Sequence, residues 1–387
     1  MRKLLAMLLA FVMLFALCAC GQTQQAAPAE EKPAEEAAPA EEAAPAEEAA
    51  PAEEAAPAEE AAPAEEEAPA EEAAETAAEE PSYVLTFTTA SVPEEAHTRV
   101  LVEYIVPRVE ELSGGRLKLE VFDSSSLFSQ DDELPATIKG NVSMCYTDGS
   151  WLATYMPSAS MFSAGYLFTN LDHMNAVMNG EIGQEFFEKV AEEVGVRCLC
   201  CYYIGSRCIN LRSSEPVMTP ADLSGVKLRM PNSEAWLMLG KALGADPVPV
   251  AFSELYTALS TGVVDGQDNP LTSTEEGKFY EVTGSISITN HQIGALWPCI
   301  NEALWQEMGE ELQGYLLQAF EEGIDYNNNL ILEKENSLIE FFESEGLKVG
   351  YPDIPAFKEQ VLNYYLADKE FTKDWDMDLY ERIQALG

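Results

Sequence analysis

The sequence D-L-S-G-V-K-L-R-M-P-N-S occupies residues 222–233, and its middle part alternates apolar and basic side chains. Alternation with a period of two is typical of a strand that is buried on one face only. Arg229 is the last basic residue of this strand, and Pro231, which lacks the N–H that a sheet interior needs, ends it. The pattern therefore predicts a rigid strand end that holds a guanidinium beside a turn, which is a suitable place to bind a small anion.

The chain downstream alternates between helices and strands. Residues 233–243 have helical periodicity, and Gly244 ends that helix. The letters G-A-D-P-V-P-V-A-F-S-E-L-Y-T-A-L-S-T-G-V-V-D-G-Q-D-N-P then cover residues 244–270. They predict an extended segment, a second helix that ends at Gly262, and a short buried strand at residues 263–264 before a turn. This order of strands and helices is an α/β unit.

Four linked motifs in this stretch resemble the substrate-binding proteins of TRAP transporters, of the dicarboxylate-binding (DctP) type. They are G-V-K-L-R-M-P at 225–231, G-A-D-P-V-P-V at 244–250, F-S-E-L-Y-T-A-L at 252–259 and G-V-V-D-G-Q-D-N-P at 262–270. The run E-L-S-G-G-R-L-K-L-E-V-F at 111–122 matches the same family. The resemblance implies an α/β fold of the two-domain periplasmic-binding-protein (Venus flytrap) type, with a hinged cleft and a long bracing helix.

The family arrangement also implies where the two lobes lie in the chain. One α/β domain comprises residues 83–204 plus 295–334, and the other comprises 205–294 plus 335–387. Apolar residues recur with helical spacing through residues 310–345, which predicts one long helix or two helices end to end, about 54 Å in length. Such a helix exceeds one small domain, so we expect it to brace both.

The first twenty residues have the order of a bacterial lipoprotein signal peptide. A basic start, M-R-K, precedes an apolar core at residues 4–17, and the box L-C-A-C ends at Cys20. The core is too short to span a membrane comfortably. For residues 1–20 we expect removal of the signal peptide and lipidation of Cys20, which would anchor the protein to the outer face of the cytoplasmic membrane. An ordinary secretory signal with a chance cysteine is the alternative.

Residues 21–80 repeat P-A-E-E-A-A and contain almost no apolar side chain larger than alanine. Alanine before each proline is disfavoured in helical geometry, and the glutamates repel one another. We therefore predict an extended, disordered tether between the anchor and the folded part, rather than a dedicated binding segment.

Four candidate pocket residues follow from strand ends, because ligands of open α/β sheets bind beyond the carboxyl ends of the strands. Ser91 follows the first predicted strand. Thr147, Asp148 and Trp151 lie at or just after the end of the strand predicted at residues 142–147. For Trp151, local packing is the alternative to a role in the pocket.

The resemblance implies five further ligand-binding residues. Arg229 and Arg207 would each pair with a ligand carboxylate in a planar two-bond fork. Asn269 would donate amide hydrogens to the same carboxylate, Phe252 would form an apolar wall, and Asn232 would line the pocket. The alternatives are a structural ion pair for Arg229, a surface position for Arg207 and a turn role for Asn269.

No catalytic or metal-binding motif stands out in the sequence. The three histidines, His97, His173 and His291, have no metal-ligand spacing, and we expect His173 at the surface. Nucleophile elbows, phosphate loops and dinucleotide fingerprints are missing as well. We therefore expect neither enzymatic activity nor a cofactor or metal.

Six cysteines remain after the signal peptide, and C-L-C-C lies in a strand predicted at residues 196–203. Their spacing fits no zinc site. We interpret them as small buried apolar residues, while a disulfide such as Cys201–Cys208 stays open.

Taken together, the sequence predicts an extracytoplasmic solute-binding lipoprotein of a TRAP transporter. It would capture a small organic acid between two lobes and deliver it to the TRAP membrane subunits. A binding protein of an ABC importer, a ligand-sensing module and an extracellular hydrolase are the alternatives. Residues 81–387 carry 47 acidic and 19 basic side chains, which argues against a nucleic-acid partner.

Overall fold

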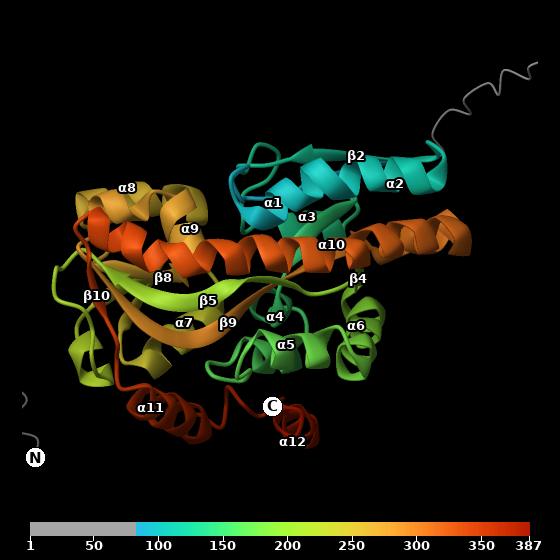
Figure 1. The fold of residues 1–387 in the computed structure, drawn as a ribbon. Helices are drawn as coiled ribbons and strands as arrows, with labels where there is room; N and C mark the ends of the chain where they lie inside the picture. The colour runs from blue at the N-terminus through green and yellow to red at the C-terminus, as the bar shows by residue number, and fades with distance from the viewer. Residues whose placement is uncertain (1–82) are drawn as a thin grey trace, which may run out of the picture. The chain divides into compact units, whose positions relative to one another are not determined.

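The computed structural model describes residues 83–387, in which a mixed β-sheet is covered by helices (Figure 1). The strands are β1 (Tyr83–Thr88), β2 (Leu117–Phe122), β3 (Met144–Thr147), β4 (Val196–Cys198), β5 (Tyr202–Leu211), β6 (Lys227–Met230), β7 (Asp246–Pro249), β8 (Gly266–Pro270), β9 (Ser285–Asn301) and β10 (Lys348–Gly350). Their order is β2-β1-β3-β9-β5-β8-β6-β7, and β4 and β10 also pair with β9.

The long strand β9 connects both halves of the sheet. Its last residues pair antiparallel with β3 and β4, and its earlier residues pair antiparallel with β5 and parallel with β10. On one side of β9, β1 lies parallel between β2 and β3. On the other side, β6 lies parallel between β7 and β8. Strand pairing therefore continues from one half of the sheet to the other.

The helices cover the sheet and its ends. They are α1 (Ala96–Val100), a π-helical turn (Leu101–Ile105), α2 (Val106–Ser113), α3 (Glu133–Ile138), α4 (Gly149–Leu152), α5 (Leu171–Met178), α6 (Glu181–Val194), α7 (Glu234–Leu243), α8 (Leu255–Thr261), α9 (Leu271–Glu276), α10 (Glu302–Ser344), α11 (Ile354–Ala367) and α12 (Met377–Gln384). Short 3₁₀ turns span Pro157–Ser163, Pro220–Leu223, Phe252–Glu254 and Phe279–Val282.

The long bracing helix predicted from residues 310–345 is confirmed as α10. Gly309 interrupts it near its start with φ 77° and ψ 159°, which leaves an unbroken helix from the next residue onwards. Along its length α10 packs against α1, α2, β5, α9 and β10. Figure 1 shows it in orange, running past both halves of the sheet.

The deciding stretch folds largely as predicted. The alternating segment is β6, and Pro231 follows it directly, but the strand is not buried on one face only: Arg229 is buried as well as Leu228 and Met230. Ser233 caps α7 by accepting a hydrogen bond from the Trp236 N–H at 3.3 Å. Gly244 ends α7 with φ 104°, a left-handed conformation that costs glycine least.

The strand predicted at residues 263–264 is wrong in position. The strand lies a few residues later, as β8, and Val263 is 56% exposed. The residues of β8 are polar, yet Gln267 and Asp268 are fully buried because their side chains are hydrogen-bonded inside the fold. A search for apolar runs in the sequence therefore misses this strand, because its residues are polar.

Two other predictions need correction. His173 is buried rather than at the surface: its Nε2 lies 2.8 Å from the carbonyl oxygen of Ile383, so the ring ties α5 to the C-terminal helix α12. The strand predicted at residues 196–203 is divided into β4 and the start of β5. In the gap, the Asn179 side chain bonds both the N–H and the carbonyl of Cys201, which replaces the ladder hydrogen bonds there.

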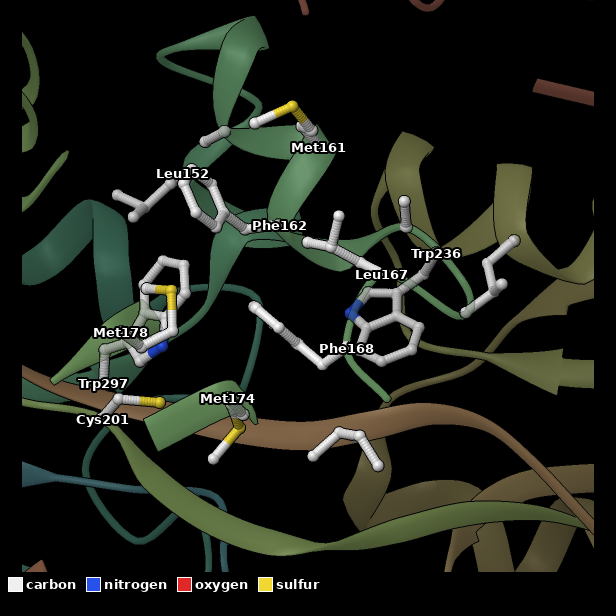
Figure 2. Close-up of a cluster of buried hydrophobic side chains, with 14 of the residues drawn as sticks. Leu152, Met161, Phe162, Leu167, Phe168, Met174, Met178, Cys201, Trp236 and Trp297 are labelled. Carbon is white, nitrogen blue, oxygen red and sulfur yellow. The ribbon is translucent and has the colours of Figure 1, made fainter. Parts of the chain in front are cut away.

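A large apolar cluster includes side chains from α4, α5, α6 and α7. Figure 2 shows part of it, with Phe162, Met174, Trp236 and Trp297 among the labelled side chains. Phe162 and Trp297 pack edge to face, with 6.2 Å between their ring centroids. Phe162, Trp236 and Trp297 also line the cavity described below, so one wall of that cavity is continuous with the core.

All six cysteines of the described residues are buried free thiols, and this includes Cys201 and Cys208. Cys145 and Cys299 lie opposite each other on β3 and β9, with their Sγ atoms 3.6 Å apart. Burial raises the pKa of both thiols, so they are packed as neutral, apolar groups.

Some predictions are not tested by this structure. The signal peptide at residues 1–20, with Cys20, and the tether at 21–80 lie outside the described residues. The boundaries proposed for the two lobes also stay predictions.

Candidate functional site

A small cavity of about 90 Å³ lies beyond the ends of several strands. Ser91 follows β1, Asp148 follows β3 and Pro231 follows β6, and all three line it. Arg207 from β5 and Asn269 from β8 also line it. The cavity thus occupies the position that the strand-end rule predicts for a ligand site.

Arg229 is the least satisfied charged group in the cavity wall. Its side chain is 1% exposed, Nε donates a 2.8 Å hydrogen bond to the carbonyl oxygen of Val250, and Nη2 has no hydrogen-bond partner. Its Cζ lies 6.0 Å from the ring centroid of Phe252. Burial lowers the pKa of Arg229 to about 9, although the charge of Asp268 opposes this, and the guanidinium remains cationic at neutral pH.

Arg207 has the same charge but already has partners. Its Nε lies 2.8 Å from Asp268 Oδ2, and its Nη2 donates to the Asp268 carbonyl at 2.6 Å and to Asn269 Oδ1 at 3.0 Å. The guanidinium also lies over the ring of Trp236, with 4.5 Å to the centroid. The surface position that we considered for Arg207 is wrong, since the side chain is only 4% exposed.

Asp268 connects Arg207 to a buried histidine. His291 Nε2 lies 3.1 Å from Asp268 Oδ2, and His291 Nδ1 lies 2.8 Å from Thr289 Oγ1. Burial alone would raise the pKa of Asp268, but the Arg207 charge and the hydrogen bonds from His291 and Arg207 hold it well below its usual range. Burial lowers the pKa of His291, so a neutral ring that donates from Nε2 fits these contacts.

Asn269 and Phe252 lie on the wall near the two arginines. Asn269 is 6% exposed and donates from Nδ2 to Gln267 Oε1 at 2.6 Å, which leaves the second amide hydrogen for another acceptor. Phe252 contacts Phe279 edge to face, and its backbone N–H donates a 3.3 Å hydrogen bond to the side-chain oxygen of Gln130.

Asp148 and Trp151 line the cavity as expected from the end of β3. Asp148 caps α4: its Oδ1 accepts from the N–H groups of Ser150 and Trp151, at 2.7 and 3.1 Å, and from the Ser150 hydroxyl. Burial raises the pKa of Asp148 above its ordinary value, although these hydrogen bonds oppose the shift. Trp151 is half-buried and also packs against the core, so both roles considered for it apply.

Two predicted residues do not reach the cavity wall. Asn232 is exposed and donates a 2.9 Å hydrogen bond to Asp131 Oδ2, because the chain turns outward after Pro231. Thr147 is fully buried one residue before the wall and is not part of its lining.

Sequence reasoning missed other residues that line the same cavity. Glu95, His97, Trp236 and Gln292 are each at least nine-tenths buried and belong to the wall. The rule that led to Ser91 extends to Glu95 and His97, which lie one helical turn further along the same connection. No local signal points to Trp236 or Gln292, because their places depend on how α7 and β9 pack.

Gly205 directs β5 toward this site. The pairing of β5 with β9 shifts register between Tyr203 and Gly205, and such a bulge re-aims the side chains that follow, here Arg207. Gly205 has φ 109°, and a Cβ atom there would lie 2.6 Å from Pro270 Cβ. A side chain at this position therefore cannot fit without movement of the backbone.

Gly205→Ala is expected to destabilise the protein by about 1–3 kcal/mol, because the conformation and the contact with Pro270 both become strained. Urea denaturation followed by circular dichroism measures this. Gly314→Ala is the matched control: it lies in α10 with open space around its Cα, and we expect stabilisation of about 0.4–1 kcal/mol there. Equal stability changes in the two variants would contradict the role given to Gly205.

Residues 83–387 contain neither a candidate metal site nor a candidate membrane span. No group of three or more His, Cys, Asp or Glu side chains in this range has an arrangement that could hold a metal ion. None of the helices in it combines the length and the apolar composition that a membrane span requires.

A two-domain α/β fold around a small cavity, with an arginine donor in its wall that has no partner, is the arrangement expected of a solute-binding protein. The chain belongs to the family described as bacterial extracellular solute-binding protein, family 7 (DctP), which it matches over residues 90–373. This family comprises extracytoplasmic substrate-binding proteins of transporters, not enzymes. The fold class and the family expected from the sequence are thereby confirmed.

Relatives and solved structures agree with this assignment. A solute-binding protein of Roseobacter denitrificans is 35% identical over 257 residues, which cover 66% of this chain and 78% of the relative. The sialic acid-binding periplasmic protein SiaP of Vibrio cholerae is 30% identical over 278 residues, 72% of this chain and 85% of SiaP. A crystal structure of a TRAP periplasmic solute-binding protein from Roseobacter denitrificans, with bound 3-deoxy-D-manno-oct-2-ulosonic acid, has a TM-score of 0.75 and 36% identity over 79% of this chain and 99% of its own.

Proposed function

We propose that this protein is the extracytoplasmic solute-binding lipoprotein of a TRAP transporter, and that it captures a small organic acid and delivers it to the membrane subunits. The observation that carries the proposal is the guanidinium of Arg229, which is 1% exposed and lacks a partner at Nη2. A buried cation that is not hydrogen-bonded to a carboxylate is costly, and a ligand carboxylate would supply both a close negative charge and the missing acceptor.

The chemistry of related proteins supports an acid as the ligand. The structure from Roseobacter denitrificans holds 3-deoxy-D-manno-oct-2-ulosonic acid, and another from Sulfurospirillum deleyianum, 26% identical with a TM-score of 0.72, holds succinate. Relatives also include a sialic acid-binding protein. These ligands differ in size and in hydroxyl content but share a carboxylate.

The size of the cavity favours a small ligand. A cavity needs at least about 10–15 Å³ to hold one water molecule, so the 90 Å³ found here has room for a small ligand. We therefore expect a small acid rather than a peptide or an oligosaccharide.

The carboxylate would lie against Arg229, with Arg207 and Asn269 beside it. At contact distance inside a dry cavity, these donors outweigh the negative charge of the whole domain, which salt screens over about 8 Å. Arg207 is held in place by Asp268 and bonds Asn269, so it would hold Asn269 in position and also add positive potential at the site.

Closure of two lobes would trap the acid. We place the lobes at residues 83–204 plus 295–334 and 205–294 plus 335–387. Hydrogen bonds near the cavity that cross this division include Asn232 to Asp131 at 2.9 Å, the Phe252 N–H to Gln130 at 3.3 Å and Ser273 to Glu95 at 3.0 Å. These contacts would form when the lobes close, and the closed form would dock on the membrane subunits.

Titration calorimetry on hits from a thermal-shift screen of organic acids tests the binding function. We expect at least one acid to bind with a one-to-one stoichiometry, and neutral sugars of the same length not to bind. A protein that binds only uncharged solutes would contradict the proposal. The identity of the neighbouring genes separates the transporter types: genes for two TRAP membrane subunits support the proposal, and an ATPase gene supports an ABC importer.

Lipidation of Cys20 is a separate prediction. Cys20→Ala is expected to leave the precursor uncleaved or to release the protein, since the box L-C-A-C loses the residue that would be modified. Membrane fractionation with metabolic labelling by a fatty acid measures both effects. Ala19→Gly, which keeps a small residue before the cysteine, serves as the control that should remain labelled. Normal processing and anchoring of Cys20→Ala would refute the prediction.

A further inference from the structure

A second polar wall of the cavity lies where β1 leads into α1. Glu95, His97 and Ser91 belong to it, and Glu95 and His97 are each only 4% exposed. Ser91 Oγ lies 2.7 Å from His97 Nε2. The site proposed for an anion therefore also contains a buried carboxylate, Glu95, which the function as proposed so far does not use.

Two hydrogen bonds hold the Glu95 carboxylate in place. Its Oε2 accepts from the Val92 N–H at 3.1 Å, and its Oε1 accepts from the hydroxyl of Ser273 at 3.0 Å. Each carboxylate oxygen has two acceptor positions, so both oxygens can accept one more hydrogen bond. Glu95 is thus a rigid acceptor with capacity for a donor from the ligand.

Among the described residues that line the cavity, no cation besides Arg229 is free to bind an anion. Arg207 and Arg229 are the basic residues among the described residues of the wall, and Arg207 is already bonded to Asp268. Glu276, whose pKa the Glu95 charge helps to raise, is bonded to Lys334 at 2.6 Å, and Lys334 also bonds Glu275 at 2.7 Å.

Two other oxygen groups of the wall reinforce this acceptor character. Gln292 is 8% exposed, its Nε2 donates to the Ser163 carbonyl at 2.8 Å, and its Oε1 has no hydrogen-bond partner. Asp148 adds a second carboxylate. The wall thus combines one unpartnered guanidinium with several acceptors.

We propose that Glu95 accepts a hydrogen bond from a ligand hydroxyl and repels a second carboxylate, so that the ligand is a polyhydroxylated monocarboxylic acid rather than a dicarboxylic acid. This inference rests on the proposed binding of an organic acid at Arg229. A ligand with one carboxylate satisfies Arg229, and its hydroxyls donate to Glu95 and Gln292. A dicarboxylate of equal length places a negative charge near Glu95 with no donor between them, which is unfavourable in a site closed to water.

Calorimetry with matched pairs of acids tests this selectivity. Galactonate and galactarate share their hydroxyl configuration and differ at one end, which is CH₂OH in the first and a carboxylate in the second. D-Erythronate and meso-tartrate form a shorter pair of the same kind, and succinate is a dicarboxylate without hydroxyls. For the wild-type protein we expect the monocarboxylate of at least one pair to bind about tenfold or more tightly than its dicarboxylate.

Glu95→Gln tests the residue itself. The change keeps the shape, removes the charge and adds an amide donor, so we expect the preference for the monocarboxylate to fall by about tenfold or more. Glu94→Gln is the matched control: Glu94 is the neighbouring glutamate, but it is exposed and does not line the cavity, so the preference should persist. Melting temperatures of both variants report whether the fold is retained.

The possible outcomes separate the two proposals. Tighter binding of succinate or of the dicarboxylates by wild type would overturn the inference but leave organic-acid binding intact. An unchanged preference in Glu95→Gln would overturn the role of Glu95. If no acid binds to wild type, and neutral sugars do, the proposed function fails together with this inference.

Discussion

Arg229→Ala lowers the affinity for the organic acid by a factor of about 10²–10³ or more, and this is the largest effect on binding that we expect. The substitution leaves the ligand carboxylate buried without its cationic partner, and breaking a buried pair in this way costs about 3–5 kcal/mol. Arg229→Lys loses much of the same affinity, because an ammonium group cannot form the planar two-bond fork.

The free protein should respond differently from the complex. Since Arg229 Nη2 has no partner in the structure, Arg229→Ala removes an unsatisfied buried charge, and the melting temperature without ligand should stay the same or rise. Arg382→Ala is the control, because Arg382 is exposed and forms an ion pair with Glu185 away from the cavity. Calorimetry and thermal melting of these variants test both expectations. If a folded Arg229→Ala protein kept its affinity, the ligand carboxylate would have to bind elsewhere. A large loss of stability would indicate that Arg229 forms a structural ion pair instead.

Arg207→Met is expected to have the largest effect on stability, about 3–5 kcal/mol at pH 7. The change leaves Asp268, which is fully buried, without the guanidinium that lies 2.8 Å away. Urea denaturation measures the loss in free energy of unfolding. Arg382→Met, which removes an exposed ion pair, should cost no more than about 1 kcal/mol and serves as the control.

The pH dependence of this loss has a defined sign. The pKa of Asp268 lies well below its usual range in the folded wild type, so its contribution to stability is present above the unfolded pKa, near 4, and is lost as the pH falls further. In Arg207→Met, burial acts without the arginine charge, so the pKa of Asp268 rises and protonation relieves the buried charge. The difference in stability between the two proteins should therefore shrink from pH 7 toward pH 4. A constant difference over this range would contradict the pairing of Arg207 with Asp268.

Several features of the site could be predicted because they depend on local patterns. The alternation around Arg229 and the proline after it predicted a strand end, and β6 has this form. The strand-end rule predicted that Ser91 and Asp148 line a common cavity, and they do. The long helix was visible because its apolar residues keep helical spacing over many turns.

Other features depend on groups that meet only in the folded chain. β8 is a polar strand whose burial is tolerated because Asp268 finds Arg207 and His291, and no stretch of sequence indicates these partners. Asn232 was expected in the cavity but turns outward to Asp131, about a hundred residues away. His173 was expected at the surface, but the C-terminal helix covers it.

By itself, the sequence determined the class of fold, the family and the presence of a cationic strand end, because alternation, helical spacing and linked motifs are local properties of the chain. The tertiary structure alone decided which arginine is free for a ligand. Arg207 and Arg229 look alike in the sequence, yet Asp268 compensates one and leaves the other without a partner at Nη2. The tertiary structure also placed the Glu95 carboxylate in the same cavity. Local sequence could not predict these roles, because the energy of a buried charge depends on the charges around it, and those charges come from distant parts of the chain.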